Sequence, residues 1–312
     1  MLSERKIAAV FGASGFLGRY VVQRLAARGY TVRAAVRDTE AAKILRPMGA
    51  AGQIVTLYAP VSEEVLVARA VEGAEVVINL AGILTESRRG DFQRIHAVGA
   101  GLVARLARAA GAKLVHVSAI GANPASPSLY ASSKGEGEQA VASAHPQAVI
   151  LRPSIIFGPE DNFFNRFAKM AVVSPVLPIV HGETKFQPVY VADVADAVLA
   201  ALGPVDVGKL FELGGTAQLS FKALIKQMLM IIERKPCLWD MPVGLARLAA
   251  MVPGSGLTSD QITLLAADNV VTPGMPGLIE LGIAPTPMDL VLPHYLARYR
   301  LGGRRHNDIY RE

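Results

Sequence analysis

The sequence predicts an α/β protein in which a doubly wound parallel sheet is accompanied by a smaller, mostly helical C-terminal domain. Three observations predict this fold. Short apolar runs alternate with helical patterns through the first half, glycines close the expected helices, and the alternation weakens after Pro153. At 312 residues the chain is long enough for one large domain or two. We expect a first domain over 1–153 plus about 186–203, and a second over 154–185 plus 204–312.

Each expected element of the first half has a residue pattern that defines it. The helix over 91–110 is expected from an apolar stripe that includes Ile95 and Val98. Right-handed crossovers between successive parallel strands place such helices on both faces of the sheet. The expected strands are 7–11, 31–36, 53–57, 75–80, 113–118 and 148–151, and the helices between them are 15–28, 39–45, 63–71, 91–110 and 130–144.

Composition and charge narrow the classes of function. Hydrophobic residues make up 51% of the chain and charged residues 19%, which favours a folded core over disorder. The net charge of +6 suits anionic cofactors or lipids, but no interleaved basic and aromatic patch indicates nucleic-acid binding. Cys237 is the single cysteine, so neither an intrachain disulfide nor a cysteine-rich metal site is expected. The apolar run 7–11 is too short for a signal peptide, and no membrane-spanning helix is expected.

A glycine loop of the form GxxGxxG lies between the first expected strand and the first expected helix. Such a loop turns tightly, lets the backbone approach a pyrophosphate and packs the helix closely, as in the Rossmann fold. The free N–H groups and the positive end of the helix dipole then bind the paired phosphates of a dinucleotide. The alternative is a glycine-rich turn without a ligand. The expected cofactor-binding residues here are Gly12, Ser14, Gly15, Phe16, Leu17 and Gly18.

The end of the second expected strand decides which dinucleotide binds. A carboxylate about 20 residues beyond the loop binds the ribose hydroxyls of NAD, but Arg37 stands there, and Arg33 precedes it on the strand. A guanidinium binds a 2′-phosphate through paired hydrogen bonds, so we expect NADPH, with NADP preferred over NAD. The alternative is that Arg37 is solvated and Asp38 faces the ribose. The remaining expected cofactor contacts, at the ends of other strands, are Leu80, Ala81, Gly82 and Pro153.

Three residues are candidates for catalysis. Tyr130 and Lys134 are four residues apart on an expected helix and therefore share one face. A nearby ammonium lowers the pKa of a tyrosine from about 10, and such a tyrosine exchanges a proton while a hydride moves to or from nicotinamide. Ser118, at the end of the fifth expected strand, would hydrogen-bond the substrate oxygen. The alternative is that Tyr130 and Lys134 hold the nicotinamide ribose and no turnover occurs.

These residues together resemble the extended short-chain dehydrogenase/reductase superfamily. Further strings resemble a narrower branch, the nucleotide-binding accessory subunit of respiratory complex I in its bacterial form. The strings that carry this narrower resemblance are Leu151–Asp161, Phe163–Phe167, Phe186–Val191, Asp268–Val271, Leu281–Ile283 and Leu292–Leu296, and Val189–Ala195 belongs to the superfamily pattern.

The resemblance implies that NADPH is bound as a structural element. It implies a subunit that docks on the peripheral arm of complex I near the quinone site, on the cytoplasmic side of the bacterial inner membrane. The alternative is a free NAD(P)-dependent reductase or epimerase, because the candidate catalytic residues are all present. The residues that the resemblance assigns to the cofactor are Gly12, Gly15, Gly18, Arg37, Tyr130 and Lys134.

Two departures from the superfamily pattern concern the site. Members often carry an aspartate after the third strand to bind adenine, and 57–60 contains none. His96 stands where the fourth long helix often has an asparagine that supports a proton relay, which weakens the case for catalysis. We expect His96 to be an ordinary helix residue rather than a catalytic base.

Two regions of the C-terminal half bear on partners. The apolar segment 163–180 is expected to be core rather than a partner-binding surface. The basic C-terminus is expected to contact anionic lipid or an acidic partner, or to be a solvated tail. Its arginines are Arg298, Arg300, Arg304, Arg305 and Arg311.

Overall fold

The computed structural model describes residues 6–204, 209–252 and 257–302. Within these residues the chain forms two compact units, each of which draws on three separate segments of sequence. The first unit comprises Met1–Pro153, Val191–Leu213 and Thr272–Ala284, and the second comprises Ser154–Tyr190, Gly214–Val271 and Pro285–Glu312.

The first unit is built on a parallel sheet, which has seven strands within the described residues in the order β11-β6-β5-β4-β1-β2-β3. Its central strands are apolar except for Asn79 at the end of β4, which suits a sheet that helices cover on both faces. All six strands expected in the first half are present. The strands are β1 Ile7–Phe11, β2 Thr31–Val36, β3 Ile54–Tyr58, β4 Val76–Asn79, β5 Lys113–Val117, β6 Val149–Pro153 and β11 Leu210–Leu213.

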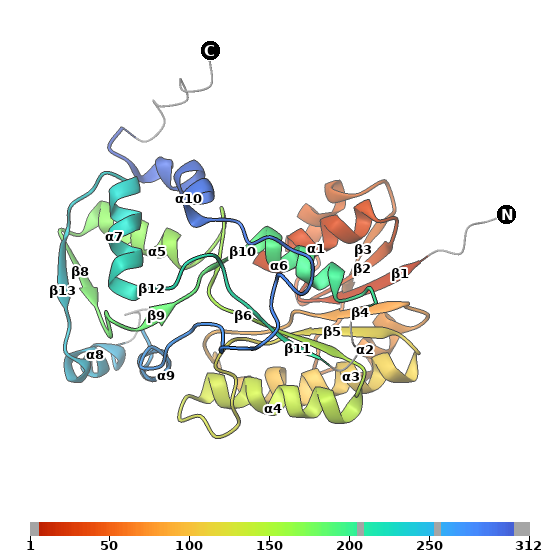
Figure 1. The fold of residues 1–312 in the computed structure, drawn as a ribbon. Helices are drawn as coiled ribbons and strands as arrows, with labels where there is room; N and C mark the ends of the chain where they lie inside the picture. Colours follow the sequence, from red (N-terminus) through yellow and green to blue (C-terminus); the bar gives the residue numbers. More distant parts are fainter. Residues whose placement is uncertain (1–5, 205–208, 253–256, 303–312) are drawn as a thin grey trace, which may run out of the picture. The chain divides into compact units, whose positions relative to one another are not determined.

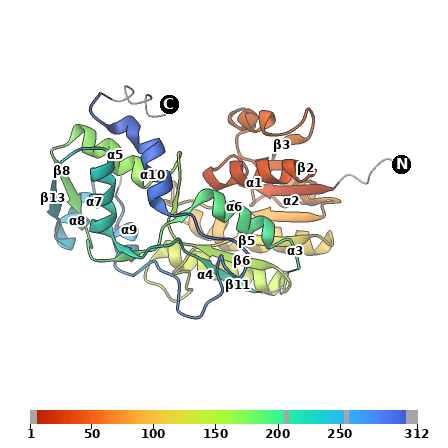
Figure 2. The same ribbon diagram turned by 45° about the horizontal axis from the view of Figure 1, so that its top comes forward.

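Helices lie on both faces of this sheet, as the doubly wound fold requires (Figures 1 and 2). Helices α1 (Phe16–Ala27) and α6 (Val191–Ala200) lie on one face, and α3 (Ala100–Ala109) and α4 (Leu129–Ala144) lie on the other. The core on the second face also takes in α2 (Glu64–Val71). The core side chains there include Phe11, Val67, Val77, Val103 and Val141.

The topology of the sheet determines where a ligand can bind. From β1 the chain runs through β2 to β3, then crosses back to form β4 on the other side of β1. The connections after β1 and β4 therefore diverge at the carboxyl edge of the sheet. Ligands of open α/β sheets bind in the crevice at such a switch point.

Two expected helices differ from the structure. The 91–110 segment begins with a π-helix, Gln93–Gly99, before α3. A π-helical turn contains more residues than an α-helical turn, so side chains within it do not keep the α-helical spacing. Val98 is therefore 61% exposed, whereas Ile95 is buried as expected. The helix expected at 39–45 is a 3-10 helix, Ala41–Met48.

The segments assigned to each unit follow from strand pairing. Strand β11 pairs with β6 at the edge of the large sheet, so it belongs to the first unit although we expected it in the second domain. Thr272–Ala284 joins it, because Glu212 N donates to Pro276 O at 2.9 Å. Residues 186–190, expected in the first domain, lie in the second unit, where their strands pair.

The second unit is mostly helical, with short strand pairs within its described residues. Its core gathers aromatic side chains such as Phe164, Phe186 and Phe221, and Leu177 packs with them, so the segment 163–180 contributes to the core as expected. The helices are α5 Phe164–Val173, α7 Phe221–Ile231, α8 Val243–Ala250, α9 Ser259–Leu264 and α10 Met288–Leu296. The paired strands are β7 Ile156–Phe157 with β10 Val189–Tyr190, β8 Val176–Ile179 with β13 Cys237–Asp240, and β9 Lys185–Phe186 with β12 Leu219–Ser220.

Buried polar contacts hold distant strings of the second unit together. Tyr295 on α10 donates its hydroxyl proton to Asp161 Oδ2 at 2.5 Å, and Asp161 also accepts from the backbone N–H of Gly158. Ser154 Oγ donates to Asn269 Oδ1 at 2.6 Å. The bonded residues belong to the segments Leu151–Asp161, Asp268–Val271 and Leu292–Leu296, which resemble the complex I subunit family. These segments are far apart in sequence but are in contact within the second unit. Among the described residues, no helix is long and apolar enough to cross a membrane.

Candidate functional site

The glycine loop after β1 packs so closely that side chains do not fit at two of its positions. Gly12 has φ +78°, and a Cβ there would lie 2.9 Å from the carbonyl carbon of Leu80. A Cβ on Gly18 would lie 2.3 Å from Gly12 O. The loop is therefore held between the first turn of α1 and the end of β4, at the switch point of the sheet.

The first turn of α1 is suited to an anion. Gly15 is its N-cap and offers no side chain to the free backbone N–H groups, and the first turn contains no acidic residue. Gly15 N donates to Gly12 O at 3.1 Å, which closes the loop beneath the helix. Phe16 and Ser14 are partly exposed and Leu17 is buried. The partial positive charge of the helix terminus is thus not neutralised by this chain's own carboxylates in that turn.

The residues after β4 and β6 lie at the same carboxyl edge. Leu80 N donates to Phe11 O at 3.0 Å, and Asn79 Oδ1 accepts from Ala81 N at 3.1 Å, which turns the chain beside the glycine loop. Gly82 follows and is exposed. Pro153 is buried at the end of β6, where its carbonyl accepts from Ile120 N at 3.0 Å.

The charged residues at the end of β2 have different surroundings. Arg37 and Asp38 are both exposed, but Asp38 Oδ1 accepts from the backbone N–H groups of Glu40 and Ala41, at 3.0 Å each. The Asp38 carboxylate is thus bound by the backbone at the start of the following 3-10 helix, whose N-cap is Glu40. Arg33 donates to Ala70 O at 3.1 Å at the end of α2, so its guanidinium is not directed to the same place as Arg37.

The candidate catalytic residues lie at two places in the first unit. Ser118 follows the carboxyl end of β5, and Tyr130 and Lys134 lie in the N-terminal turns of α4. Lys134 Nζ donates to Val117 O at 3.0 Å, immediately before Ser118. Ser118 is 5% exposed, and its Oγ has no hydrogen-bond partner within the described part of the chain. The Tyr130 ring lies edge-on to His96, with ring centroids 5.5 Å apart. A buried hydroxyl without a partner is the group expected to bond a ligand oxygen.

The pKa of Tyr130 is shifted in the opposite direction from the one expected. We expected a neighbouring ammonium to lower the pKa of the tyrosine. Burial instead raises the pKa of Tyr130 to about 12, because a tyrosinate would lose its hydration there. Burial also lowers the pKa of Lys134 to about 8, against the opposing effect of Glu138. At neutral pH the pair is therefore a neutral phenol and an ammonium.

His96 is a buried residue of the π-helix before α3. Its Nε2 accepts from Ile83 N at 3.0 Å, so the proton lies on Nδ1, which donates to Ser133 Oγ at 2.9 Å. The Ser133 hydroxyl in turn donates to Tyr130 O at 2.9 Å. Burial, and then the Lys134 charge, lower the pKa of His96 to about 3. With both nitrogens engaged, His96 joins the 80–83 turn to α4 and is not a general base.

A set of buried charges that was not expected from the sequence lies beside Lys134. Glu138, one turn further along α4, forms an ion pair with Arg152 on β6, and Arg152 also contacts Glu212 on β11. The spacing of Lys134 and Glu138 was a signal for this set, since residues four apart on a helix are neighbours. No pattern in the sequence indicated the partners on the strands.

Among the described residues, no group of His, Cys, Asp and Glu side chains could hold a metal ion.

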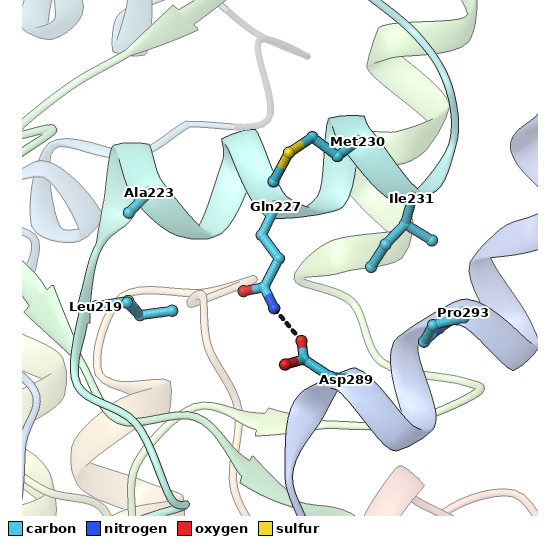
Figure 3. Close-up of a pocket in the computed structure, with 7 residues that line it drawn as sticks. All are labelled: Leu219, Ala223, Gln227, Met230, Ile231, Asp289 and Pro293. Atoms are coloured by element: carbon cyan, nitrogen blue, oxygen red, sulfur yellow. Dashed lines mark hydrogen bonds between the residues drawn. The ribbon is translucent and has the colours of Figure 1, made fainter.

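The second unit contains a separate cavity of about 560 Å³ beside α7 and α10 (Figure 3). Gln227 Nε2 donates to Asp289 Oδ1 across it, and most other lining side chains are apolar. None of the cofactor or catalytic residues expected from the sequence lines this cavity. The lining residues are Leu219, Ala223, Gln227, Met230, Ile231, Asp289 and Pro293.

Comparison with known proteins identifies the family. The model of the NAD dependent epimerase/dehydratase family matches residues 8–214. NADH dehydrogenase (ubiquinone) 1 alpha subcomplex subunit 9, mitochondrial, from Mus musculus is 35% identical over 94% of this chain and 80% of its own length. A ceramide reductase from Caulobacter vibrioides is 35% identical over 63% of this chain and 61% of its own length.

Solved structures of the same architecture support the fold. An NADPH-dependent quinone oxidoreductase from Escherichia coli, complexed with NADPH, superposes with a TM-score of 0.73 at 21% identity, covering 93% of this chain and 99% of the other. A UDP-glucose 4-epimerase from Thermotoga maritima gives a TM-score of 0.69 at 18% identity, covering 94% and 98%. The chain therefore belongs to the NAD-dependent epimerase/dehydratase family, in the group that includes alpha subcomplex subunit 9 of NADH dehydrogenase.

Proposed function

We propose that this protein is an NADP(H)-binding accessory subunit of respiratory NADH:quinone oxidoreductase, complex I, and that its nucleotide is a structural element rather than a reactant. One observation carries the proposal. The family model ends at residue 214, whereas the mouse subunit aligns with 94% of the chain. The likeness to a complex I subunit therefore extends through most of the second unit, which a general dinucleotide-binding domain does not require.

The first unit fits the proposed nucleotide. The cradle formed by Gly12 and Gly18, with the uncapped first turn of α1, suits the paired phosphates. Arg37 supports NADP over NAD, because the neighbouring Asp38 carboxylate already accepts two backbone N–H groups. Lys134 supplies an ammonium for the nicotinamide ribose. A bound NADPH would contribute hydride chemistry, while this chain's own residues bind and orient it.

Two features support a held cofactor rather than turnover. The phenol of Tyr130 has a raised pKa, so it is poorly suited to lose its proton near neutral pH. His96, which occupies the expected position of the relay asparagine, uses both ring nitrogens for hydrogen bonds within the fold. The His96 ring is therefore not free to relay a proton.

The proposal includes docking on the peripheral arm of complex I near the quinone site, at the cytoplasmic side of the bacterial inner membrane. Two of the arginines that we expected to contact lipid, Arg298 and Arg300, are engaged within the second unit. Arg298 donates to Pro159 O at 3.1 Å and Arg300 donates to Ile231 O at 2.8 Å, so both guanidinium groups have partners within the second unit. The remaining basic residues, Arg304, Arg305 and Arg311, lie outside the described residues.

Purification of the tagged chain from its native membranes in mild detergent tests this function. We expect the subunits of the quinone oxidoreductase to co-purify, and mass spectrometry of the released nucleotide to find NADPH in about equal amount to the chain. A monodisperse chain that carries no oxidoreductase subunits would contradict the assembly. An assembled complex whose chain releases no nucleotide would contradict the cofactor.

The second candidate is a free NAD(P)-dependent reductase or epimerase. The buried Ser118 Oγ, which lacks a partner within the described residues, favours it, as does the ceramide reductase relative. A purified chain that oxidises NADPH with a defined carbonyl substrate would support this candidate. The activity should then be lost in Ser118→Ala, since the hydroxyl would hold the substrate oxygen.

A further inference from the structure

Helix α4 presents three polar side chains on one face, one turn apart. Tyr130 and Lys134 are the candidate ligands of the nicotinamide ribose, and Glu138 follows them. Lys134 is 5% exposed and Glu138 is 7% exposed. Burying a carboxylate is unfavourable unless a cation and hydrogen bonds compensate for the lost water. The surroundings of Glu138 therefore indicate what keeps it in place.

Arg152 on β6 holds Glu138 through two hydrogen bonds. Its Nε donates to Glu138 Oε1 at 2.9 Å, and its Nη2 donates to Glu138 Oε2 at 2.6 Å. Such a paired arrangement fixes the plane of the carboxylate as well as its position. Arg152 Nη2 also donates to Ala122 O at 3.3 Å. The carboxylate thus stays one helical turn from the Lys134 ammonium.

A second carboxylate completes the cluster. Arg152 Nη1 donates to Glu212 Oε1 at 3.3 Å, and Glu212 Oε2 accepts from Thr272 N at 2.7 Å. Glu138, Glu212 and Arg152 together carry one net negative charge. Lys134 in its ammonium form brings the buried set to neutrality. Buried charges are best tolerated in such a balanced, hydrogen-bonded group.

The other groups around Lys134 are neutral near pH 7. Burial is the main cause that lowers the pKa of His96 and of His116, and the Lys134 charge lowers both further. Tyr130 is a neutral phenol. Burial lowers the pKa of Lys134 to about 8, and the Glu138 carboxylate acts in the opposite direction. Among the described residues, Glu138 is the charged side chain that favours the ammonium.

We propose that Glu138, held by Arg152, is a positioning residue that keeps Lys134 in the ammonium form required to bind the nicotinamide ribose of the nucleotide. The inference rests on the proposed NADP(H) site and adds the charge network that supports it. Because Arg152 reaches Glu212 and Glu212 binds Thr272, the segment Thr272–Ala284 contributes to this site from the far end of the chain.

The test compares Glu138→Gln with Glu136→Gln in the purified full chain. Glu136 lies on the same helix and accepts from Ser132 Oγ, so its substitution makes the same charge change outside the network. NADPH affinity is measured by fluorescence titration from pH 6 to pH 9. Titration with 2′,5′-ADP, which lacks the nicotinamide ribose, reports whether each variant keeps a folded phosphate site.

We expect the pH above which NADPH affinity declines to move down by about 1 unit in Glu138→Gln, because loss of an adjacent opposite charge lowers the pKa of an ammonium by about that amount. At pH 8 the affinity should then be about fivefold weaker than in the wild type, and at pH 6 it should be equal. Affinity for 2′,5′-ADP, and all affinities of Glu136→Gln, should stay unchanged. A loss that is the same at every pH would overturn the proposal in favour of a purely structural role.

Arg152→Gln provides a second variant if Glu138→Gln does not fold. Removing this guanidinium removes the two hydrogen bonds that hold Glu138 beside Lys134, so the decline in affinity should again move to lower pH. No shift, or a shift to higher pH, would overturn the proposal. If the wild-type chain binds no NADPH at any pH, the proposed function fails. If it binds NADPH and neither variant shifts the profile, only this inference fails.

Discussion

The Cβ that an alanine would place at position 18 lies 2.3 Å from the carbonyl oxygen of Gly12, so helix α1 and the glycine loop contact each other through backbone alone. This contact aims the first turn of α1 at the switch point of the sheet. Gly18→Ala should therefore move the helix away from the loop, destabilise the protein by about 1–3 kcal/mol and weaken nucleotide binding.

Thermal unfolding and NADPH titration measure the two effects of Gly18→Ala. Gly244→Ala is the matched control, because a Cβ at Gly244 on α8 meets no atom within 4 Å. It should leave binding unchanged and be neutral or stabilising by up to about 1 kcal/mol, since alanine favours a helix over glycine. Equal effects of the two substitutions would mean that close packing at Gly18 is not what shapes the phosphate site.

Arg37→Ala should weaken binding of NADPH far more than binding of NADH. A hydrogen bond to a charged group contributes about 1.5–3 kcal/mol, so the loss for NADPH should be about tenfold or more. Titration of both nucleotides against the wild type and the variant measures this selectivity. Arg33→Ala is the control, because Arg33 donates to carbonyls at the end of α2 and should affect both nucleotides alike. Equal losses for both nucleotides in Arg37→Ala would remove the preference for NADP.

Tyr130→Phe should leave the quinone reductase turnover of the assembled complex largely intact. The substitution removes only a phenol hydroxyl whose raised pKa already disfavours proton transfer, and it keeps the ring against Phe92 and His96. The measurement is NADH:quinone turnover per assembled complex, with assembly checked on native gels. Complete loss of turnover in a normally assembled complex would argue that the nicotinamide reacts.

Acidification should destabilise the first unit through its buried histidines. The pKa of His96 is about 3 in the folded chain against 6.5 for the free side chain, so between these values the unfolded state binds more protons. The contribution of His96 to the free energy of unfolding is therefore greatest above pH 6.5. It falls by up to about 1.4 kcal/mol per pH unit as the pH decreases from 6.5 towards 3.

Urea unfolding at pH 7 and at pH 5 measures this dependence. His96→Asn keeps a polar side chain but cannot take up the proton, so its stability should fall less between the two values than that of the wild type. His116, whose pKa is also lowered by burial, should account for part of the remaining dependence. An unchanged difference between pH 7 and pH 5 in His96→Asn would show that His96 protonates without cost in the native state.

The elements of the first unit were predictable because their signals are local. An apolar run buried on both faces predicts a strand such as β1, and the glycine spacing after it predicts the loop and helix that follow. The placement of Tyr130 and Lys134 on one face of α4 also follows from helix geometry alone. The direction of side chains inside an irregular turn does not follow from it. Val98 lies within the π-helix before α3 and is exposed, against the expected stripe.

The sequence alone thus determined the order of strands and helices, the glycine loop and the candidate residues at the ends of the strands. Tertiary structure alone decided their charge states and partners. Arg152 meets Glu138 across 14 residues of sequence and Glu212 across 60, and such pairs form only when the sheet and its helices pack. Burial raises the pKa of Tyr130 and keeps His96 neutral. Burial arises only when distant segments pack and exclude water from these side chains, so no local sequence pattern predicts it.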